Sequence, residues 1–232
     1  MLSIELEKQE LPYEINEELK LLRTNLQFCG TDKRVILVTS AFSGEGKSTV
    51  ALDLCHSLTE LGKSVLLIDA DMRKSMLKQK VIGQQPTYGL SHLLSGQCEI
   101  DDVFYTTNVR NLSVIFSGAV PPNPTELLST QNMGTLIQIG KKYCDYVVID
   151  CPPVGLVVDA AVVAPHCDGS LILIEAGEVK YRLAQEVAAK MRATGCPILG
   201  VILNKVDHRK SGKYYGKYYG RYYGKRYQNY YQ

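Results

Sequence analysis

The sequence contains no tryptophan, no Cys-x-x-Cys pair and no long uninterrupted apolar run. Its most apolar stretch, residues 146–165, is broken by Asp150, Asp159 and two adjacent prolines, whereas a membrane-spanning helix needs ~20 apolar residues. The first residues include glutamates where a signal peptide has basic residues. The seven cysteines are an odd number and lack metal-ligand spacing. We therefore expect no export, no disulfide framework and no zinc site.

The segment 208–232 lacks both acidic and aliphatic side chains. It contains seven Lys or Arg and nine of the fifteen tyrosines, with a repeated Lys/Arg-Tyr-Tyr-Gly unit beginning at Lys213, Lys217 and Arg221. Its charge of +7 contrasts with −5 for residues 1–207. Because nothing in this segment can build a core, we predict a flexible, basic, tyrosine-rich tail.

Residues 1–207 have an ordinary globular composition and are long enough for one domain. Short runs rich in β-branched residues alternate with segments of helical periodicity, and the runs cover 35–39, 65–69, 146–150, 171–175 and 198–203. They are apolar at nearly every position, which is typical of strands covered on both faces. The predicted fold is α/β, a doubly wound and mostly parallel sheet.

A phosphate-binding loop follows the first of these runs. Residues 40–49 read Ser-Ala-Phe-Ser-Gly-Glu-Gly-Lys-Ser-Thr and lead into a helix. Such a loop directs backbone N–H groups at phosphate, with Lys47 on the β- and γ-phosphates and the Ser48 hydroxyl on Mg²⁺. The match is partial, because Ala41 stands where the motif begins with glycine. The nucleotide-binding residues predicted here are Ser43, Gly44, Glu45, Gly46, Lys47, Ser48 and Thr49.

Three aspartates stand at the ends of the next apolar runs. Asp69 and Asp71 follow one run, and Asp150 ends another in the position of a Walker B aspartate. Ligands of open α/β sheets bind at such strand ends, so Asp150 can serve Mg²⁺ while Asp69 or Asp71 meets the metal or an attacking hydroxyl. Taken singly, each aspartate fits a helix cap or turn equally well. Together, after a phosphate loop, they favour a nucleotide and magnesium site.

With these motifs the sequence resembles the bacterial tyrosine kinases of capsular and exopolysaccharide systems. The resemblance rests on Gly-Glu-Gly-Lys-Ser-Thr at 44–49, Asp-Ala-Asp-Met-Arg at 69–73, Asp-Cys-Pro-Pro at 150–153, the segment 118–128 and the tyrosine cluster. It implies an ATP- and Mg²⁺-dependent protein-tyrosine kinase of P-loop type. Lys47, Asp69 and Asp71 would be catalytic, and Ser48, Asp69 and Asp150 would hold the metal. Arg73 would contact phosphate or the second acid. The implied acceptors are Tyr214, Tyr215, Tyr218, Tyr219, Tyr222, Tyr223, Tyr227, Tyr230 and Tyr231.

The resemblance also implies partners and a division of the chain. An amphipathic helix marked by apolar residues at 15, 19, 22 and 26 must lie against the body or a partner. It includes Glu17, Lys20 and Arg23, where the family has Glu-x-x-Arg-x-x-Arg for assembly into a ring such as an octamer. We expect a helical docking or oligomerisation segment at 1–30, a P-loop kinase domain at 31–207 and the acceptor tail at 208–232, with phosphate transfer in trans.

The resemblance further implies a cytoplasmic kinase that regulates polysaccharide synthesis and export. A membrane adaptor would recruit the kinase to the inner face of the cell membrane and activate it. The kinase would phosphorylate protein tyrosine substrates, and a cognate tyrosine phosphatase would oppose it.

Two alternatives remain open from the residues. The first is a switch ATPase of the partitioning or division-site class, although those proteins have a lysine early in the loop where Phe42 stands here. The second concerns the tail, whose composition also fits binding to nucleic acid or anionic lipid; the kinase-like body favours the acceptor role, so no nucleic-acid partner is expected. Asn204, after the last run, is a candidate adenine contact or a simple turn residue.

Overall fold

The computed structural model describes residues 2–7 and 10–206, and within them nine strands form one sheet. The strands are β1 (Leu2–Leu6), β2 (Val35–Ser40), β3 (Val65–Asp69), β4 (Val81–Ile82), β5 (Tyr105–Thr107), β6 (Leu112–Ile115), β7 (Tyr146–Asp150), β8 (Gly169–Glu175) and β9 (Ile198–Asn204). Their order is β4-β1-β5-β6-β3-β7-β2-β8-β9. Neighbours run parallel except β1–β4 and β5–β6.

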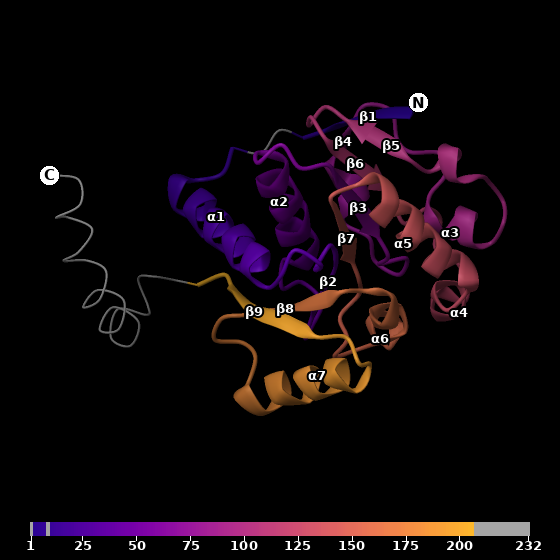
Figure 1. The fold of residues 1–232 in the computed structure, drawn as a ribbon. Coiled ribbons are helices and arrows are strands. Elements are labelled where there is room, and N and C mark those ends of the chain that lie inside the picture. The colour runs from indigo at the N-terminus through magenta and orange to yellow at the C-terminus, as the bar shows by residue number, and fades with distance from the viewer. Residues whose placement is uncertain (1, 8–9, 207–232) are drawn as a thin grey trace, which may run out of the picture.

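Helices cover both faces of this sheet (Figure 1). One face carries α1 (Tyr13–Phe28) and α2 (Lys47–Thr59), and the other carries α3 (Leu90–Leu94), α4 (Pro124–Leu128), α5 (Gln131–Tyr143), α6 (Asp159–Val163) and α7 (Tyr181–Ala193). Short 3₁₀ helices are η1 (Leu77–Lys80), η2 (Ile100–Asp102) and η3 (Ala164–His166). The doubly wound α/β prediction is confirmed.

The central strands explain why the apolar runs do not alternate with polar residues. Every residue of β2 and β3 is buried. Along β2, Val35 and Leu37 pack with α5 and α7, whereas Ile36 and Val38 pack with α1 and α2. Successive side chains of a strand point to opposite faces, so a sheet with a core on each side needs apolar residues at consecutive positions.

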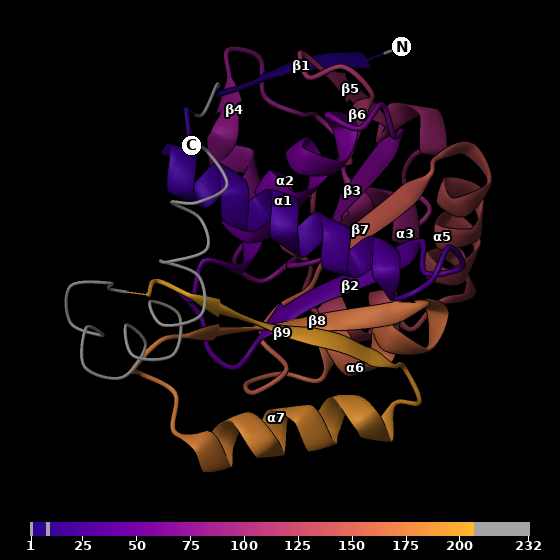
Figure 2. The ribbon, with the colours of Figure 1, turned by 60° about the vertical axis from the view of Figure 1, so that its left-hand side comes forward.

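The amino-terminal segment differs from the prediction of a helical segment over 1–30. Residues 2–6 form β1, which lies between β4 and β5 in the sheet (Figure 2). Ile4 and Leu6 are buried, and the Asn108 side chain bonds both the N–H and the carbonyl of Leu6, at 2.9 and 3.0 Å. Only α1 matches the predicted helix; its Leu19 and Leu26 are buried, and the helix packs against α2.

The predicted flexible tail and its acceptor tyrosines lie outside the described residues. Within the described ranges, no helix combines the length and apolarity that a membrane crossing needs.

A buried carboxyl group in α2 makes the stability of the protein depend on pH. Burial raises the pKa of Asp53 to about 6, although the nearby Lys80 charge opposes the shift. Since the unfolded carboxyl ionises near pH 3.9, Asp53 costs stability as the pH rises from about 4 to 6, and the full cost remains above that range. We expect Asp53→Asn to raise the free energy of unfolding at pH 7.5 by roughly 2–3 kcal/mol, and the gain to shrink toward pH 4.

Urea unfolding of wild type and Asp53→Asn at several pH values measures this gain. Asp101→Asn is the matched control, because Asp101 is exposed in η2. An equal gain at pH 4 and pH 7.5 would contradict the titration as its cause.

Candidate nucleotide and phosphoryl-transfer site

The loop between β2 and α2 is built on glycines. Gly44 and Gly46 have φ values of +88° and +90°, a left-handed conformation that other residues adopt only with strain. A Cβ on Gly46 would also lie 2.5 Å from Nδ2 of Asn204. Because α2 begins at Lys47, directly after this turn, the loop presents the amino terminus of a helix to the ligand.

A glycine from another segment lies against Ala41, which stands where the motif begins with glycine. Ala41 is fully buried, and its carbonyl oxygen lies 2.0 Å from where a Cβ on Gly155 would stand. The close backbone contact thus uses a glycine in the segment after β7 rather than one in the loop. Sequence reasoning missed Gly155, although it follows the Asp-Cys-Pro-Pro motif by only two residues.

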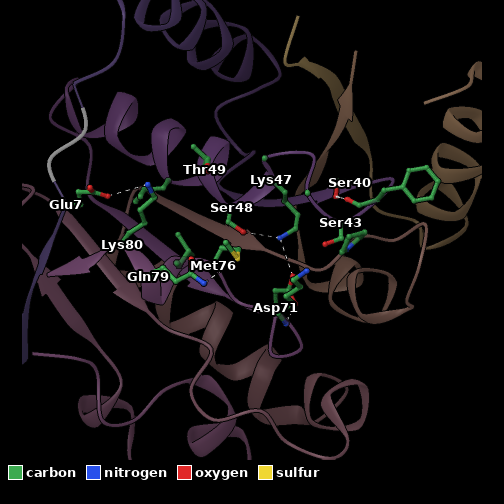
Figure 3. A pocket seen from close by; sticks show the side chains of 17 residues that line it. Glu7, Ser40, Ser43, Lys47, Ser48, Thr49, Asp71, Met76, Gln79 and Lys80 are labelled. Carbon is green, nitrogen blue, oxygen red and sulfur yellow. Dashed lines mark hydrogen bonds and ion pairs between the residues drawn. The ribbon is translucent and has the colours of Figure 1, made fainter. Parts of the chain in front are cut away.

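A cavity of about 520 Å³ opens above this loop (Figure 3). Among the predicted nucleotide-binding residues, Ser43, Gly44, Gly46, Lys47, Ser48 and Thr49 line it. The Glu45 side chain does not line the cavity; its carboxylate accepts backbone N–H bonds from Phe42 at 2.7 Å and Glu175 at 3.1 Å. Glu45 therefore fixes the shape of the loop and does not present its charge to phosphate.

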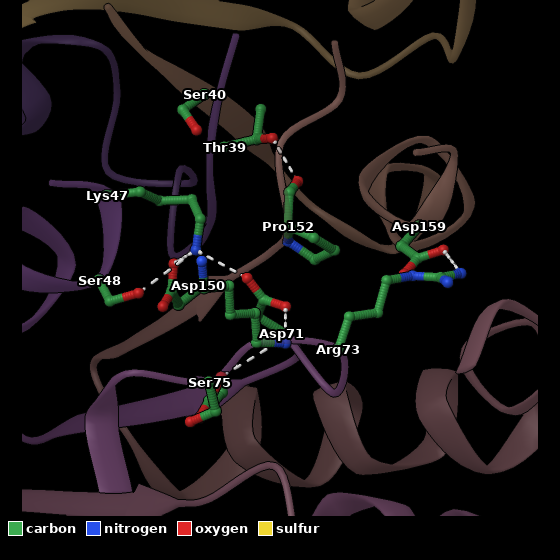
Figure 4. A network of polar contacts seen from close by, with 12 residues as sticks. Thr39, Ser40, Lys47, Ser48, Asp71, Arg73, Ser75, Asp150, Pro152 and Asp159 are labelled. Atoms are coloured by element: carbon green, nitrogen blue, oxygen red, sulfur yellow. Dashed lines mark hydrogen bonds and ion pairs between the residues drawn. The ribbon is translucent and has the colours of Figure 1, made fainter. Parts of the chain in front are cut away.

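Lys47 lies between two of the predicted aspartates (Figure 4). Its Nζ is 2.6 Å from Oδ1 of Asp150 and 3.6 Å from Oδ2 of Asp71, and all three side chains are buried. Burial alone would lower the pKa of Lys47, but the charge of Asp150 and its hydrogen bond outweigh this and raise it. Lys47 is therefore held as a cation beside the cavity, as phosphate binding requires.

Asp69 and Asp71 occupy different environments although they are two residues apart. The Asp69 carboxylate accepts the backbone N–H of Asp71 at 3.2 Å and the hydroxyl of Ser75, and it does not line the cavity. Burial, with the Asp150 charge, raises the pKa of Asp69 to about 7. Asp71 does line the cavity. Ser75 was not predicted, and its position six residues after Asp69 gives no local signal.

Arg73 makes no hydrogen bond or ion pair with Asp71, the second acid of the expectation, while a contact with phosphate stays a prediction. Its guanidinium donates two hydrogen bonds to the Asp159 carboxylate, at 2.7 and 3.0 Å, and one to Thr125 at 2.8 Å. Thr125 in turn donates to Asp159 at 2.6 Å. Asp159 is fully buried, so its charge draws the guanidinium away from the cavity toward α4 and α6 (Figure 4).

The last residues of β8 and β9, and Lys205 after β9, contact the phosphate loop or one another. Asn204 donates through Nδ2 to the carbonyl of Glu45 at 2.8 Å. Lys205 donates to the carbonyl of Gly44 at 2.8 Å and to the Glu175 carboxylate at 2.8 Å. Asn204 thus contacts the loop backbone, and its contact with adenine stays a prediction.

The three predicted oligomer residues on α1 make contacts within the chain. Glu17 and Lys20 form an exposed ion pair at 2.7 Å. Arg23 bonds the carbonyl of Ser57 at 2.6 Å and the Glu60 carboxylate at 2.7 Å, both on or beside α2.

The donors for Mg²⁺ are few but of the right kind. No three His, Cys, Asp or Glu side chains form a metal-binding group in the described part of the chain. The Oδ2 atom of Asp150 is buried and has no hydrogen-bond partner among those residues, and the Ser48 hydroxyl lines the cavity. Mg²⁺ of P-loop enzymes takes one hydroxyl and one carboxylate from the protein and its other ligands from phosphate and water, so Ser48 and Asp150 fit it. The Asp69 carboxylate accepts from the Asp71 N–H and the Ser75 hydroxyl and does not line the cavity, so its metal role stays a prediction.

Together, the buried strand β2, the glycine turn and the helix beginning at Lys47 and Ser48 make this chain a P-loop nucleotide-binding protein. In agreement, the family model described as an AAA domain matches residues 33–185.

Comparisons with known proteins narrow the class. A tyrosine-protein kinase CpsD of Streptococcus agalactiae is 41% identical over 191 residues, covering 82% of this chain and 83% of that protein. The solved chimerical protein CapA2B2 aligns with a TM-score of 0.80 at 28% identity, over 89% of this chain and 94% of that chain. The BceF tyrosine kinase domain aligns with a TM-score of 0.75 at 36% identity, over 83% and 78%. The chain therefore belongs to the bacterial tyrosine-protein kinases of capsule and exopolysaccharide synthesis, and it is an ATP-dependent protein-tyrosine kinase.

The switch ATPases share its fold. MinD of Pyrococcus horikoshii aligns with a TM-score of 0.64 at 24% identity, over 78% of this chain and 76% of that chain. A likeness at this identity shows the fold alone, whereas the relative at 41% identity is a kinase.

Proposed function

We propose that this kinase phosphorylates the tyrosines of its own tail, with Asp71 accepting the proton of the attacking hydroxyl. The observation that carries this assignment is that Asp71 is the member of the Asp69–Asp71 pair that lines the cavity, 3.6 Å from Lys47. A tyrosine hydroxyl is a poor nucleophile near neutral pH, so a carboxylate next to the phosphate site is the group it needs.

In the proposed phosphoryl transfer, one bond to phosphorus forms and one breaks within this site. The tyrosine oxygen forms a bond to the γ-phosphorus as the bond from that phosphorus to the ADP oxygen breaks, and the hydroxyl proton moves to Asp71. Lys47 and the loop N–H groups bind the phosphates. Ser48 and Asp150 would hold Mg²⁺, which supplies positive charge for the phosphate oxygens.

The tail is suited to be the acceptor by its sequence and by where it begins. It starts just beyond Asn204 and Lys205, which bond the phosphate loop itself. Its charge of +7 is attracted to a body of charge −5.

We further propose that the chain works in a homo-oligomer, is recruited to the inner face of the cell membrane and activated by a membrane adaptor, and is opposed by a tyrosine phosphatase. Membership of the kinase family supports these partners. A second support is the exposed apolar surface of α1, where Tyr13 is 74% exposed and Phe28 is 83% exposed. For the ring itself the support is weaker, since Arg23 is engaged with Glu60 of its own chain.

Intact-protein mass after incubation with ATP and Mg²⁺ tests the function. We expect mass gains of one or more phosphates in wild type, and none in Lys47→Met or in a chain whose nine tail tyrosines are phenylalanine. ATP hydrolysis without any phosphate on protein, even with an adaptor's cytoplasmic segment present, would overturn the proposal in favour of a switch ATPase.

Arg73 is proposed as a positioning residue, because its contacts tie the segment after Asp71 to Asp159 and Thr125. Arg73→Gln is expected to lower kcat roughly tenfold to a hundredfold while leaving KM for ATP unchanged, since small misplacement of a reacting group has effects of this size. Arg73→Lys should recover only part of the rate, because it keeps the charge but loses the two-pronged contact.

Steady-state kinetics with an acceptor peptide measure this split between kcat and KM. The matched control is Arg110→Gln, at an exposed arginine. If Arg73→Gln and Arg110→Gln behave alike, Arg73 has no part in positioning.

A further inference from the structure

One end of the cavity is not explained by nucleotide binding. The phosphate loop lines one part of the cavity, and Lys47, Ser48 and Asp71 lie at its middle (Figure 3). The cavity wall continues past Asp71 to the end that lies opposite Ser43. The residues of that end belong to no phosphate-loop motif. These residues are Glu7, Leu52, Met76, Leu77, Gln79 and Lys80.

The nucleotide and the acceptor must approach Asp71 from different sides. In-line transfer places the attacking and leaving oxygens on opposite sides of the γ-phosphorus. Asn204 contacts the Glu45 carbonyl and Lys205 contacts the Gly44 carbonyl, both on the β9 side of the loop. With the phosphates on the loop, the incoming hydroxyl reaches Asp71 from the end with Met76 and Lys80.

We propose that this end, formed by Met76, Leu52 and Glu7, is the acceptor subsite, and that it binds the Lys/Arg-Tyr-Tyr-Gly repeat of the tail. The inference rests on the proposed tail phosphorylation and names the subsite that recognises the acceptor. Met76 and Leu52 contact the tyrosine ring, and Glu7 pairs with the basic residue before it.

The apolar part of the subsite has an exposed side chain ready to bind a ring. Met76 is 46% exposed although it lies in a cavity wall, whereas Leu52 and Leu77 beneath it are buried. A flexible thioether beside aliphatic carbons is a good surface for an aromatic ring. This half of the subsite explains how tyrosine, rather than a smaller hydroxyl-bearing residue, would fill the space next to Asp71.

The charged part is supplied by the amino-terminal strand. β1 ends at Leu6, and the N–H of Glu7 bonds the carbonyl of Lys80 at 2.8 Å, which brings Glu7 to the cavity. Its carboxylate is 60% exposed and only loosely paired with Lys80 at 3.5 Å, so an incoming cation can compete for it.

The tail matches this arrangement in every repeat. Lys213, Lys217 and Arg221 each stand directly before a pair of tyrosines, and Arg226 stands before Tyr227. A carboxylate at the subsite therefore meets a cation directly before the first tyrosine of each repeat, whereas Tyr230 follows Asn229.

A charge-reversal experiment tests the subsite. The parent is the full-length chain with its nine tail tyrosines replaced by serine, and the added acceptors are peptides of Lys-Tyr-Tyr-Gly or Glu-Tyr-Tyr-Gly repeats. We expect the parent to prefer the lysine peptide. Glu7→Lys should raise KM for the lysine peptide and lower it for the glutamate peptide, each roughly threefold, the effect of an exposed charge pair. Met76→Ser should raise KM for both.

Controls separate this inference from the function on which it rests. Glu5→Lys is the matched variant, because Glu5 is exposed on β1, two residues before Glu7, but does not line the cavity. KM for ATP should be unchanged in all variants, which also reports an intact fold. If Glu7→Lys behaves like Glu5→Lys, the subsite is wrong while the kinase function stands. If the parent phosphorylates neither peptide, the proposed function fails and the subsite with it.

Discussion

Lys47→Met is expected to lower autophosphorylation by at least about 10²–10³-fold, the usual effect of removing one preorganised charge from a phosphoryl-transfer site. The reason is geometric. Lys47 is the cation that lines the cavity at the start of α2, and no other described lysine or arginine contacts Asp150. Mass spectrometry of the intact protein over a time course gives the rate.

The same substitution should also destabilise the nucleotide-free protein, by roughly 3–5 kcal/mol, because it leaves Asp150 and Asp71 buried without their cation. Adding Asp150→Asn to Lys47→Met should recover most of this stability and none of the activity. Denaturant unfolding of the single and double variants separates the two roles of Lys47.

Lys63→Met is the matched control for both effects. Lys63 also pairs with an aspartate, Asp145, but at 3.7 Å and with both side chains more than 40% exposed. Exposed pairs of this kind contribute at most about 1 kcal/mol. Equal unfolding free energies for Lys47→Met and Lys63→Met would show that the buried charge cluster does not stabilise the fold.

Asp71→Asn is the second large effect: kcat for tyrosine phosphorylation should fall about 10²–10⁴-fold, the range for losing a positioned proton acceptor. KM for ATP should change little, since an amide keeps the shape of the side chain and the phosphates are bound by the loop. Asp69→Asn should reduce kcat far less, because the Asp69 carboxylate does not line the cavity and bonds the Asp71 N–H and the Ser75 hydroxyl instead.

The comparison of these two variants tests which aspartate accepts the proton. Steady-state kinetics with an added tyrosine peptide measure kcat and KM for each. A larger loss in Asp69→Asn than in Asp71→Asn would reverse the assignment.

The sequence predicts the centre of this molecule well because the centre is governed by burial. β2, β3, β7, β8 and β9 are covered by helices or continue a parallel sheet, and their apolar runs are long enough to identify. β1, β4 and β5 are two to five residues long and lie toward one edge of the sheet. Such strands depend on their neighbours rather than on their own composition.

The candidate site also has one part that the sequence predicts and another that it does not. The phosphate loop could be predicted because its chemistry depends on a contiguous motif. The partners of Arg73 could not, since Asp159 and Thr125 are brought to it by α6 and α4 from 86 and 52 positions away. The motif predicts Glu45 in the nucleotide site because Glu45 belongs to it. In the structure the Glu45 carboxylate instead accepts hydrogen bonds from the backbone N–H groups of Phe42 and Glu175.

The insertion of β1 into the sheet has a practical consequence for handling the protein. β4 pairs with β1, and β5 pairs with it on one side. Deleting residues 2–6 would strip hydrogen-bond partners from both strands and bare the apolar surface that Ile4 and Leu6 cover. Open strand edges recruit other chains, so a trimmed protein would tend to aggregate. A bulky fusion at the amino terminus would lie a few residues from Glu7 and the acceptor subsite proposed there, so a purification tag belongs elsewhere.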